Sequence, residues 1–527
     1  MYVTRLLASS DTPSEGHQMR TLHTDVVVVG ARPAGASTAI TLVKHGHRVI
    51  AVDQGHFPSD TLSTHIMTPQ VVATTARLGA LDRLLATGAP PLHSFHIYAE
   101  DFEPECPYET PEGFDFGISV RRPDFDSAML ETAREAGVDV LEGTKAIGPV
   151  WAGGRLAGIR ARDRSGEEFI IRARAVVGAD GRHSTVASWV GSEQPYRIWP
   201  NQRGMVWMYF DDPRPVRDSW LMTRVGDTIG FHFPCNDGAL VLLMPPVADI
   251  EKFRADPEGM WTAKLGMLPR LRERLVDAHA QTKQRLAEDL SSYFRISSGP
   301  GWALVGDAGH FKDPVIGHGM HDALVWGSAL GEKLARALNE DDESVDRALR
   351  SYERERDRGV LASLYLAGRF TRTHSLAAPE AELWRELESD ANRRREFGNS
   401  YTRTIPLEPQ FSFPKLTKWA VKSVMRSSED RAGTASFVAA ELQLKVGYWY
   451  DRSQLALGRR ARANKAARCD TWPDEMLLEE RASVMRNTPR TTGYHGKGDR
   501  RPPADLEAAR NLVQASMAIL DNDTSQR

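Results

Sequence analysis

The chain has 527 residues, 41% of them hydrophobic and 26% charged, and a formal net charge of −3. This length predicts two or three domains, and the small net charge gives no reason to expect a nucleic acid or an anionic membrane as a partner. The three cysteines (Cys106, Cys235 and Cys469) are far apart, which argues against a disulfide framework or zinc site and favours a cytoplasmic protein. No apolar run approaches the ~20 residues of a transmembrane helix, so no membrane span is expected.

The first 22 residues are expected to be a disordered lead-in. A βαβ unit follows, with a β-branched strand at 24–30, a helix at 33–45 and a second strand at 47–53. The next elements are predicted as strand and turn at 94–120, a helix at 127–136, a strand leading into 175–180 and an antiparallel sheet at 203–245. A buried strand at 302–306 precedes helices at 321–338 and 351–369. After residue 370 the only long apolar stretch is 436–450, which is expected to dock on the body of the protein.

Small residues occupy the turn between the first strand and its helix, in the order Gly30-Ala31-Arg32-Pro33-Ala34-Gly35. Such a turn presents the N–H groups and the positive dipole end of the helix to a pyrophosphate. Arg32 replaces the usual middle glycine, so its side chain either reaches a phosphate or points to solvent. Asp53 ends the second strand, where it can accept hydrogen bonds from ribose hydroxyls. The alternative is an ordinary glycine-rich turn with Asp53 as a loop acid.

Two further strands end in an aspartate. Residues 177–186 contain Asp180-Gly181, which taken alone indicates only a turn. Residues 303–310 place Asp307 after Gly306 at the carboxyl end of a buried strand, the edge where open α/β sheets bind ligands. The Pro/Gly-bearing segment after Asp307 opens a helix whose N–H groups can face an electron-rich ring oxygen.

Together, the order and wide separation of these three segments resemble the fingerprints of the flavoprotein monooxygenases of the p-hydroxybenzoate hydroxylase type, over about residues 24–365. Residues 122–126 (RPDFD) are similar to the Arg-x-x-Leu-Asp segment of that superfamily, whose arginine contacts FAD; the alternative is an arginine that caps a helix. Flavin-dependent halogenases and prenyl reductases share this scaffold, so the resemblance is more specific for the fold than for the reaction.

The resemblance implies an α/β fold with a Rossmann-type FAD-binding domain, a discontinuous antiparallel-sheet substrate domain and a C-terminal helical extension. The FAD-binding domain is expected to comprise 23–90, 113–187 and 296–369. The substrate domain is expected to comprise 91–112 and 188–295, followed by a helical region at 370–486 and a polar tail at 487–527.

The cofactors implied are FAD and, as electron donor, NADPH or NADH. The residues expected to bind FAD are Gly30, Ala31, Arg32, Pro33, Ala34, Gly35, Asp53, Gln54, Thr64, His65, Arg122, Asp180, Gly181, Gly306, Asp307, Pro314, Gly317, Gly319 and Met320. The family ties the segment of Asp180 and Gly181 to NAD(P)H as well.

Three positions depart from the family pattern and bear on the contacts to the nicotinamide and the flavin ring edge: Ala187, His321 and Trp326 stand where arginine, asparagine and aspartate are usual. The candidates for a base in the substrate pocket are His65, His232, His318 and His321, and a structural role is the alternative for each. Trp207, Tyr209, Phe231 and Phe233 alternate along predicted strands, as side chains over a flavin or in an ordinary core would.

The function implied is an NAD(P)H-driven monooxygenase that inserts one oxygen atom of O2 into a small organic substrate through a flavin C4a-hydroperoxide. The alternatives are a flavin-dependent reductase of an isoprenoid-like substrate, a halogenase and a flavin-binding scaffold. The sequence lacks the Trp-x-Trp-x-Ile-Pro segment typical of halogenases. The substrate stays open, and so does the choice between a monomer and a homodimer.

Overall fold

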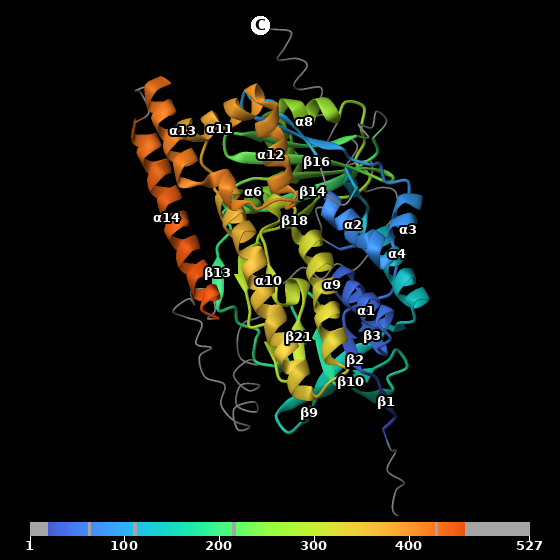
Figure 1. Cartoon of the computed structure of the whole chain (residues 1–527). Helices are drawn as coiled ribbons and strands as arrows, with labels where there is room; N and C mark the ends of the chain where they lie inside the picture. The colour runs from blue at the N-terminus through green and yellow to red at the C-terminus, as the bar shows by residue number, and fades with distance from the viewer. Residues whose placement is uncertain (1–18, 62–64, 109–112, 213–217, 427–430, 459–527) are drawn as a thin grey trace, which may run out of the picture.

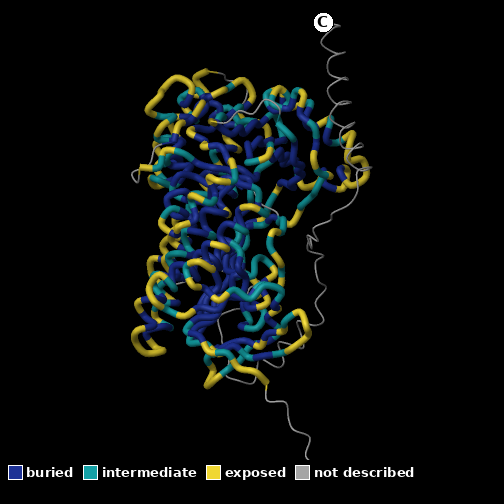
Figure 2. The backbone as a smooth tube through the Cα atoms, turned by 90° about the vertical axis from the view of Figure 1, so that its right-hand side faces the viewer, coloured by how far each residue is buried: buried dark blue, intermediate teal, exposed yellow. Residues whose placement is uncertain are grey.

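The computed structural model describes residues 19–61, 65–108, 113–212, 218–426 and 431–458. Two sheet-based bodies lie at opposite ends of the molecule, and long helices run along one side of both (Figure 1). The strands at the centre of each body are buried, whereas exposed backbone lies mainly at the ends and along the outer edge (Figure 2).

A six-stranded sheet contains the βαβ unit expected from the sequence. Its strand order is β20 (Ser298–Gly299), β21 (Trp302–Leu304), β12 (Ala175–Gly178), β2 (Val26–Val29), β3 (Val49–Asp53) and β8 (Asp139–Glu142). All neighbours are parallel except β20 and β21. Because parallel strands end at the same edge, this sheet brings together the three glycine-bearing segments that follow β2, β12 and β21.

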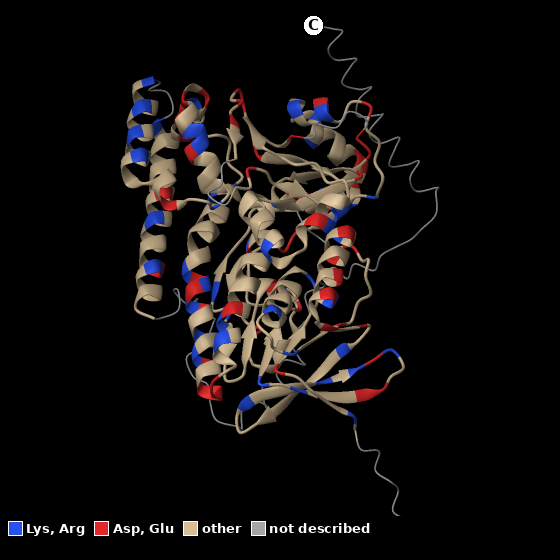
Figure 3. Cartoon of the chain, turned by 45° about the vertical axis from the view of Figure 1, so that its right-hand side comes forward, with Lys and Arg blue, Asp and Glu red and all other residues tan. Residues whose placement is uncertain are grey.

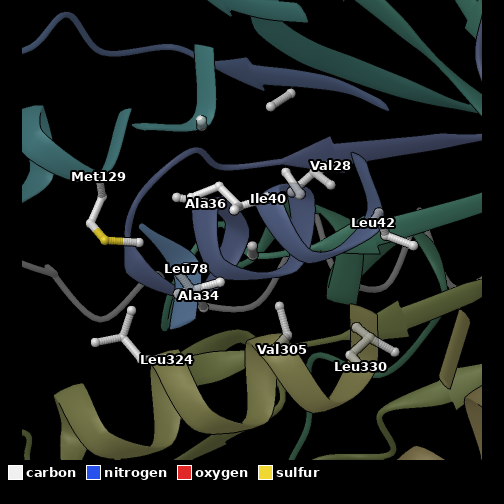
Figure 4. Close-up of a cluster of buried hydrophobic side chains, with 14 of the residues drawn as sticks. Val28, Ala34, Ala36, Ile40, Leu42, Leu78, Met129, Val305, Leu324 and Leu330 are labelled. Carbon is white, nitrogen blue, oxygen red and sulfur yellow. The ribbon is translucent and has the colours of Figure 1, made fainter. Parts of the chain in front are cut away.

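Helix α1 (Pro33–Lys44) packs on one face of this sheet, against α9 (Gly319–Ala337) and α4 (Arg122–Ala136). Figure 4 shows Ala36 and Ile40 of α1 between Val28 of β2 and the side chains of α9. The two helices approach closely because α9 has glycines where they meet. A Cβ atom on Gly327 would lie 2.7 Å from the Ala34 carbonyl oxygen, so no larger residue fits there without a shift.

A four-stranded sheet covers the other face, in the order β1 (Thr21–His23), β11 (Glu168–Arg172), β10 (Arg155–Arg162) and β9 (Lys145–Ala152). Its side chains share a buried cluster with Val27, Val29 and Ile50 of the parallel sheet. Strand β1 contains Thr21 and Leu22, which the sequence assigns to the disordered lead-in. They become ordered because β1 pairs in parallel with β11.

The second body is a seven-stranded sheet of β18 (Arg285–Ala287), β14 (Met205–Phe210), β17 (Gly238–Met244), β16 (Thr228–Cys235), β15 (Ser219–Val225), β5 (Ser94–Ala99) and β6 (Glu105–Pro107). Its pairs are antiparallel except for β15 with β5. One face packs on the helices α6 (Ile250–Ala255), α7 (Pro257–Gly266) and α8 (Pro269–Arg274). The other face carries most of the large aromatic residues of this sheet, and it packs against Val315, Ile316 and the helical residues from Leu366 onward.

Shorter elements complete this part of the fold. They are β4 (Ile66–Met67), β7 (Ile118–Ser119), β13 (Arg197–Trp199), β19 (Ser292–Phe294), β22 (His310–Phe311), α2 (Pro69–Leu78), α3 (Leu81–Ala86), α5 (Thr185–Trp189), η1 (Val247–Asp249), η2 (Gly306–Ala308) and η3 (Pro314–Ile316). β4 pairs with β7, and β13, β19 and β22 form a three-stranded sheet.

The chain ends in a helical region, as expected. Its elements are α10 (Asp342–Phe370), α11 (Ala378–Ser389), α12 (Ala391–Tyr401), η4 (Glu408–Phe411), α13 (Phe413–Arg426) and α14 (Arg431–Ala456). Helix α10 begins nine residues before the predicted start at 351, because Asp341 caps it by accepting from the Ser344 N–H (2.8 Å) and acidic residues fill its first turn. Helix α4 likewise begins at Arg122 instead of 127.

Candidate functional site: the sheet edge and the seam between the two bodies

The turn from β2 into α1 accepts only glycine at two places. Gly30 has a φ of +100° and donates its N–H to the Val52 carbonyl oxygen (2.8 Å). A Cβ atom on Gly30 would collide with the Ala179 carbonyl oxygen, and one on Gly35 would collide with that of Gly30. Helix α1 has no side-chain cap and no acid in its first turn, so its leading N–H groups fit a pyrophosphate.

Asp53 lies beside this turn and is organised by it. Its carboxylate accepts hydrogen bonds from the Ala31 N–H (2.9 Å) and the Gly55 N–H (2.8 Å). Each carboxylate oxygen retains a further lone pair, so the group fits the ribose hydroxyls of a dinucleotide. Gln54, the next residue, is exposed.

The sequence leaves open whether Arg32 reaches a phosphate or points to solvent, and the structure shows it bound to other side chains. Its guanidinium pairs with the fully buried Asp126 and donates to the Ser59 hydroxyl (2.8 Å). Asp126 also receives two hydrogen bonds from Arg122, at 2.9 and 3.0 Å. The two arginines therefore share one buried carboxylate, and this ties the first fingerprint to the start of α4.

Asp180 organises the turn that follows β12. Its carboxylate accepts from the Ser184 hydroxyl and from the Thr185 N–H, both at 2.6 Å, and so orders the start of α5. Burial raises the pKa of Asp180. Gly181 has a φ of +78° and open space around its Cα. A role of this segment toward FAD or NAD(P)H stays a prediction.

The third fingerprint lies against the first. Gly306 has a φ of +59°, and a Cβ atom there would lie 2.9 Å from the Ala34 Cβ. Among the described residues no hydrogen-bond donor reaches the Asp307 carboxyl, and burial raises its pKa to about 6. A half-buried carboxyl without a protein donor fits the hydroxyl-rich ribityl part of FAD.

Within the segment from Pro314 to Met320, most residues are buried but Gly319 is exposed. Gly317 has a φ of +65°, and Met320 is buried. Gly319 is exposed, and a Cβ atom there would meet no protein atom within 4 Å. The open space at Gly319 is compatible with the predicted approach to the flavin ring.

Tyr401 of the C-terminal region forms hydrogen bonds with this segment. The His318 Nε2 lies 2.8 Å from the Tyr401 carbonyl oxygen, and the Tyr401 hydroxyl donates to the Ile316 carbonyl oxygen (2.9 Å). His321 contacts Gln70 Oε1 at 2.8 Å, and burial lowers its pKa to about 4.

Asp322, next to His321, is the centre of a buried ionic network. It pairs with Lys312, with Arg403 (2.6 Å) and with His310 (3.0 Å). Burial alone would raise the pKa of Asp322, but Lys312 and Arg403 hold it well below its usual range. Burial lowers the pKa of Lys312 to about 8. The sequence does not predict this network, because an isolated acid in a helix carries no signal of its partners.

His65 lies at the seam, by which we mean the region between the six-stranded and the seven-stranded sheet. It is fully buried, and its Nε2 makes a short hydrogen bond with the Tyr209 hydroxyl of β14. The Arg121 guanidinium lies over the Tyr209 ring, 4.2 Å from its centroid. Burial and the nearby arginines hold the pKa of His65 well below its usual value. Thr64, the other candidate in this loop, lies outside the described residues.

His232, the remaining histidine candidate, lies away from the other three. His232 is on β16 between Phe231 and Phe233, so its side chain projects to the opposite face of the sheet, 3.5 Å from Asp212. Phe231 and Phe233 share the inward face with Trp207 and Tyr209, and this cluster also contains Val315, Ile316 and Ile66. The structure thus gathers His65, His318 and His321 near the third fingerprint but separates His232 from them.

Comparison with known proteins identifies the family. The FAD binding domain family matches residues 23–364. A digeranylgeranylglycerophospholipid reductase of Methanothrix thermoacetophila is 27% identical over 63% of this chain and 82% of its own length. A menaquinone reductase of Mycolicibacterium smegmatis is 24% identical over 58% and 75%, and a rifampicin monooxygenase of Rhodococcus hoagii is 27% identical over 60% and 64%.

Solved structures share the fold. A flavin-dependent brominase superposes with a TM-score of 0.63 at 20% identity, covering 77% of this chain and 99% of that protein. A geranylgeranyl bacteriochlorophyll reductase-like protein from Thermoplasma acidophilum superposes with a TM-score of 0.52 at 18% identity, covering 80% and 100%. With the three glycine-bearing segments at one sheet edge, the chain belongs to the FAD binding domain family of FAD-dependent oxidoreductases.

Proposed function

We propose that this FAD-dependent oxidoreductase uses NADPH or NADH to saturate carbon–carbon double bonds of an apolar, isoprenoid-like substrate. The sequence alone favours oxygen insertion as the function, with double-bond reduction as the alternative. Double-bond reduction is supported by two relatives named as reductases, which align over 82% and 75% of their own length. The rifampicin monooxygenase aligns over 64% of its length.

The observation that carries the proposal is the pair of His65 and Tyr209 at the seam. Burial raises the pKa of Tyr209 far above its usual value, so the phenol keeps its proton at neutral pH. His65 is neutral there because its pKa is lowered. The hydrogen bond between them forms a proton path from a neutral imidazole to a phenol.

Reduction of a double bond needs a hydride on one carbon and a proton on the other. Reduced FAD supplies hydride when it is bound. We assign to Tyr209 the donation of its hydroxyl proton to the second carbon. His65 then passes its Nε2 proton to the phenolate while its Nδ1 takes up a proton from solvent, so the imidazole ends neutral. NAD(P)H provides the two electrons and one proton comes from solvent, so the reaction is balanced.

The inward face of the seven-stranded sheet supports an apolar substrate. Trp207, Trp220, Phe231 and Phe233 are at most 2% exposed and share one buried cluster. Side chains of this kind bind a hydrocarbon chain through buried apolar area and exclude water from the reacting carbons.

Oxygen insertion is the second candidate, favoured by the rifampicin monooxygenase relative and by the same dry, aromatic face. The two reactions differ in oxygen use. A reductase converts a geranylgeranyl lipid anaerobically with NAD(P)H, and the product gains two hydrogens per double bond. A monooxygenase requires O2, and its product carries one atom of labelled oxygen.

Tyr209→Phe tests the proton donor. We expect anaerobic product formation to fall by about 10²-fold or more, as for the loss of a general acid, with FAD content unchanged. Tyr98→Phe is the matched control, because Tyr98 lies on β5 of the same sheet and packs with the cluster on its opposite face. Unchanged reduction by Tyr209→Phe would remove Tyr209 from the mechanism, and strict dependence on O2 would replace reduction by oxygen insertion.

A further inference from the structure

The outermost helices, α13 and α14, expose an unusual amount of apolar surface. Fourteen large hydrophobic residues are exposed among the described residues, and nine of them lie on or just after these two helices. We call these nine the outer face: Phe413, Val421, Val424, Met425, Leu442, Val446, Trp449, Tyr450 and Leu457. Helices α13 and α14 pack on each other and form one edge of the molecule (Figure 1).

The outer face follows from helical periodicity. In α14, the buried residues Phe437, Glu441, Tyr448, Asp451 and Leu455 mark the inward side. The opposite side carries Ala432, Ala435, Ala439, Leu442, Val446, Trp449, Tyr450 and Ser453 at spacings of three and four residues. No charged residue interrupts this outward stripe of α14, which is about 30 Å long at 1.5 Å per residue.

The exposed charged residues of α13 and α14 themselves are all basic, and their acidic partners on neighbouring elements are less exposed than they are. α13 contains no acidic residue, and the two acids of α14, Glu441 and Asp451, are each 1% exposed. Glu441 pairs with Arg369 and Arg372 in the interior. Every exposed charged side chain of α13 and α14 is therefore a cation. Figure 3 shows Lys and Arg positions spaced along these outer helices.

These cations have a defined position. Lys418, Lys422 and Arg426 follow one flank of α13, where they also pair with Glu382 and Glu386 of α11. Arg431 and Arg452 lie near the two ends of α14. The surface thus combines an uncharged apolar centre, a Trp–Tyr pair and a basic border.

We infer that the outer face docks on the surface of an anionic lipid bilayer, with α14 lying in the plane of the interface. An interfacial helix has this composition: a large apolar side with aromatic residues, and lysine or arginine along its border. Anionic headgroups attract such a border. No helix in the described part of the chain is long and apolar enough to cross a membrane, so the contact is peripheral.

Charge complementarity selects a bilayer over a second copy of the chain. A symmetric dimer through this face would set the basic border of one copy against the basic border of the other, which like-charge repulsion disfavours. An anionic bilayer instead gains attraction from the same residues. This inference departs from the expectation set by the net charge, which averages the basic edge with acidic residues elsewhere.

The interior beneath the outer face is continuous with the seam. Phe437 of α14 and Trp419 of α13 belong to the same buried apolar cluster as Tyr209 and Ile316. A cavity of about 20 Å³ lies between Trp384, Phe411, Trp419 and Phe437, and another of about 40 Å³ lies by Tyr448. A docked bilayer would therefore face the apolar end of a cluster that reaches the proposed reaction site. The docking inference itself does not depend on the proposed function.

Vesicle flotation of the full-length, FAD-loaded protein tests the inference. We expect binding to vesicles of equimolar phosphatidylcholine and phosphatidylglycerol, and at least about tenfold weaker binding to pure phosphatidylcholine or in 1 M salt, where the Debye length is ~3 Å. Val446→Asp should weaken binding to the mixed vesicles by about tenfold or more, because a carboxylate would enter the interface.

Val247→Asp is the matched control. Val247 is 38% exposed on η1, far along the chain from the outer face, so the same substitution should leave flotation unchanged. Flavin absorbance and melting temperature verify that both variants are folded. The inference is overturned if the wild type does not float with anionic vesicles, or if Val446→Asp floats as well as Val247→Asp. A dimer that Val446→Asp converts to a monomer, without vesicle binding, would assign the face to a second copy instead.

Discussion

The Arg403 guanidinium lies 2.6 Å from the buried carboxylate of Asp322, which is 81 positions earlier in the chain. Asp322 is in the first turn of α9, directly after the segment predicted to face the flavin. Arg403 follows α12 and also donates to the Gly359 carbonyl oxygen (2.8 Å). The C-terminal region therefore supplies one of the two cations, with Lys312, that pair with the buried Asp322.

Arg403→Met should lower the free energy of unfolding at pH 7 by about 3 kcal/mol, because it removes one partner of a buried carboxylate and leaves Lys312. Chemical denaturation measures the change. Arg48→Met is the control, since Arg48 is largely exposed beside Asp25 and should change stability by about 0.5 kcal/mol or less. Equal stability of the two variants would contradict a structural role for the Arg403 ion pair.

Gly35→Ala should reduce FAD content roughly tenfold, the loss that about 1.4 kcal/mol of weaker binding produces. Its Cβ atom collides with the Gly30 carbonyl oxygen and forces open the turn that fits the pyrophosphate. Gly368→Ala in α10, where a Cβ atom meets nothing within 4 Å, should keep its FAD. The ratio of flavin to protein absorbance of the purified variants decides between these outcomes.

Gly319→Val separates flavin contact from folding. The protein leaves open space at Gly319, so the melting temperature of the apoprotein should not change by more than a few degrees. If the flavin lies there, turnover should fall by about 10²-fold, as when one oxyanion-type donor is lost, and FAD content should exceed that of Gly35→Ala. Wild-type turnover would show that this segment is only a structural turn.

Asp307→Asn should change how the stability of the apoprotein depends on pH. Burial raises the pKa of Asp307 from an ordinary 3.8 to about 6. The folded state then binds the proton more tightly than the unfolded state, so this group lowers stability as pH rises from about 4 to about 6. The variant should lose roughly 2 to 3 kcal/mol less stability than wild type between pH 4 and pH 7. Unfolding free energies at the two pH values give the difference; equal losses in both proteins would contradict the raised pKa of Asp307.

The FAD-type half of the fold could be predicted from the sequence because its signals are local. A run of valines at Val26–Val29, a glycine turn and Asp53 fall within one βαβ unit of about 30 residues. The conformations are equally local: Gly30 and Gly306 adopt positive φ values where the sequence has glycine. The helix starts predicted at 127 and 351 lie later than the observed starts at Arg122 and Asp342, because the charged first turns lack an apolar helical pattern.

Pairings between distant residues were decided by the tertiary structure. The hydrogen bond of His65 with Tyr209 spans 144 positions, and Arg32 turns toward Asp126 across 94. No local pattern encodes either one, because each depends on how two separately formed elements pack. The apolar stretch at 436–450 illustrates the same limit. Its composition indicated burial, but neighbouring helices cover only one side of α14 and leave Val446 and Trp449 exposed. Amino-acid composition determined that this helix would be apolar; only packing against α10 and α13 determined which side faces outward.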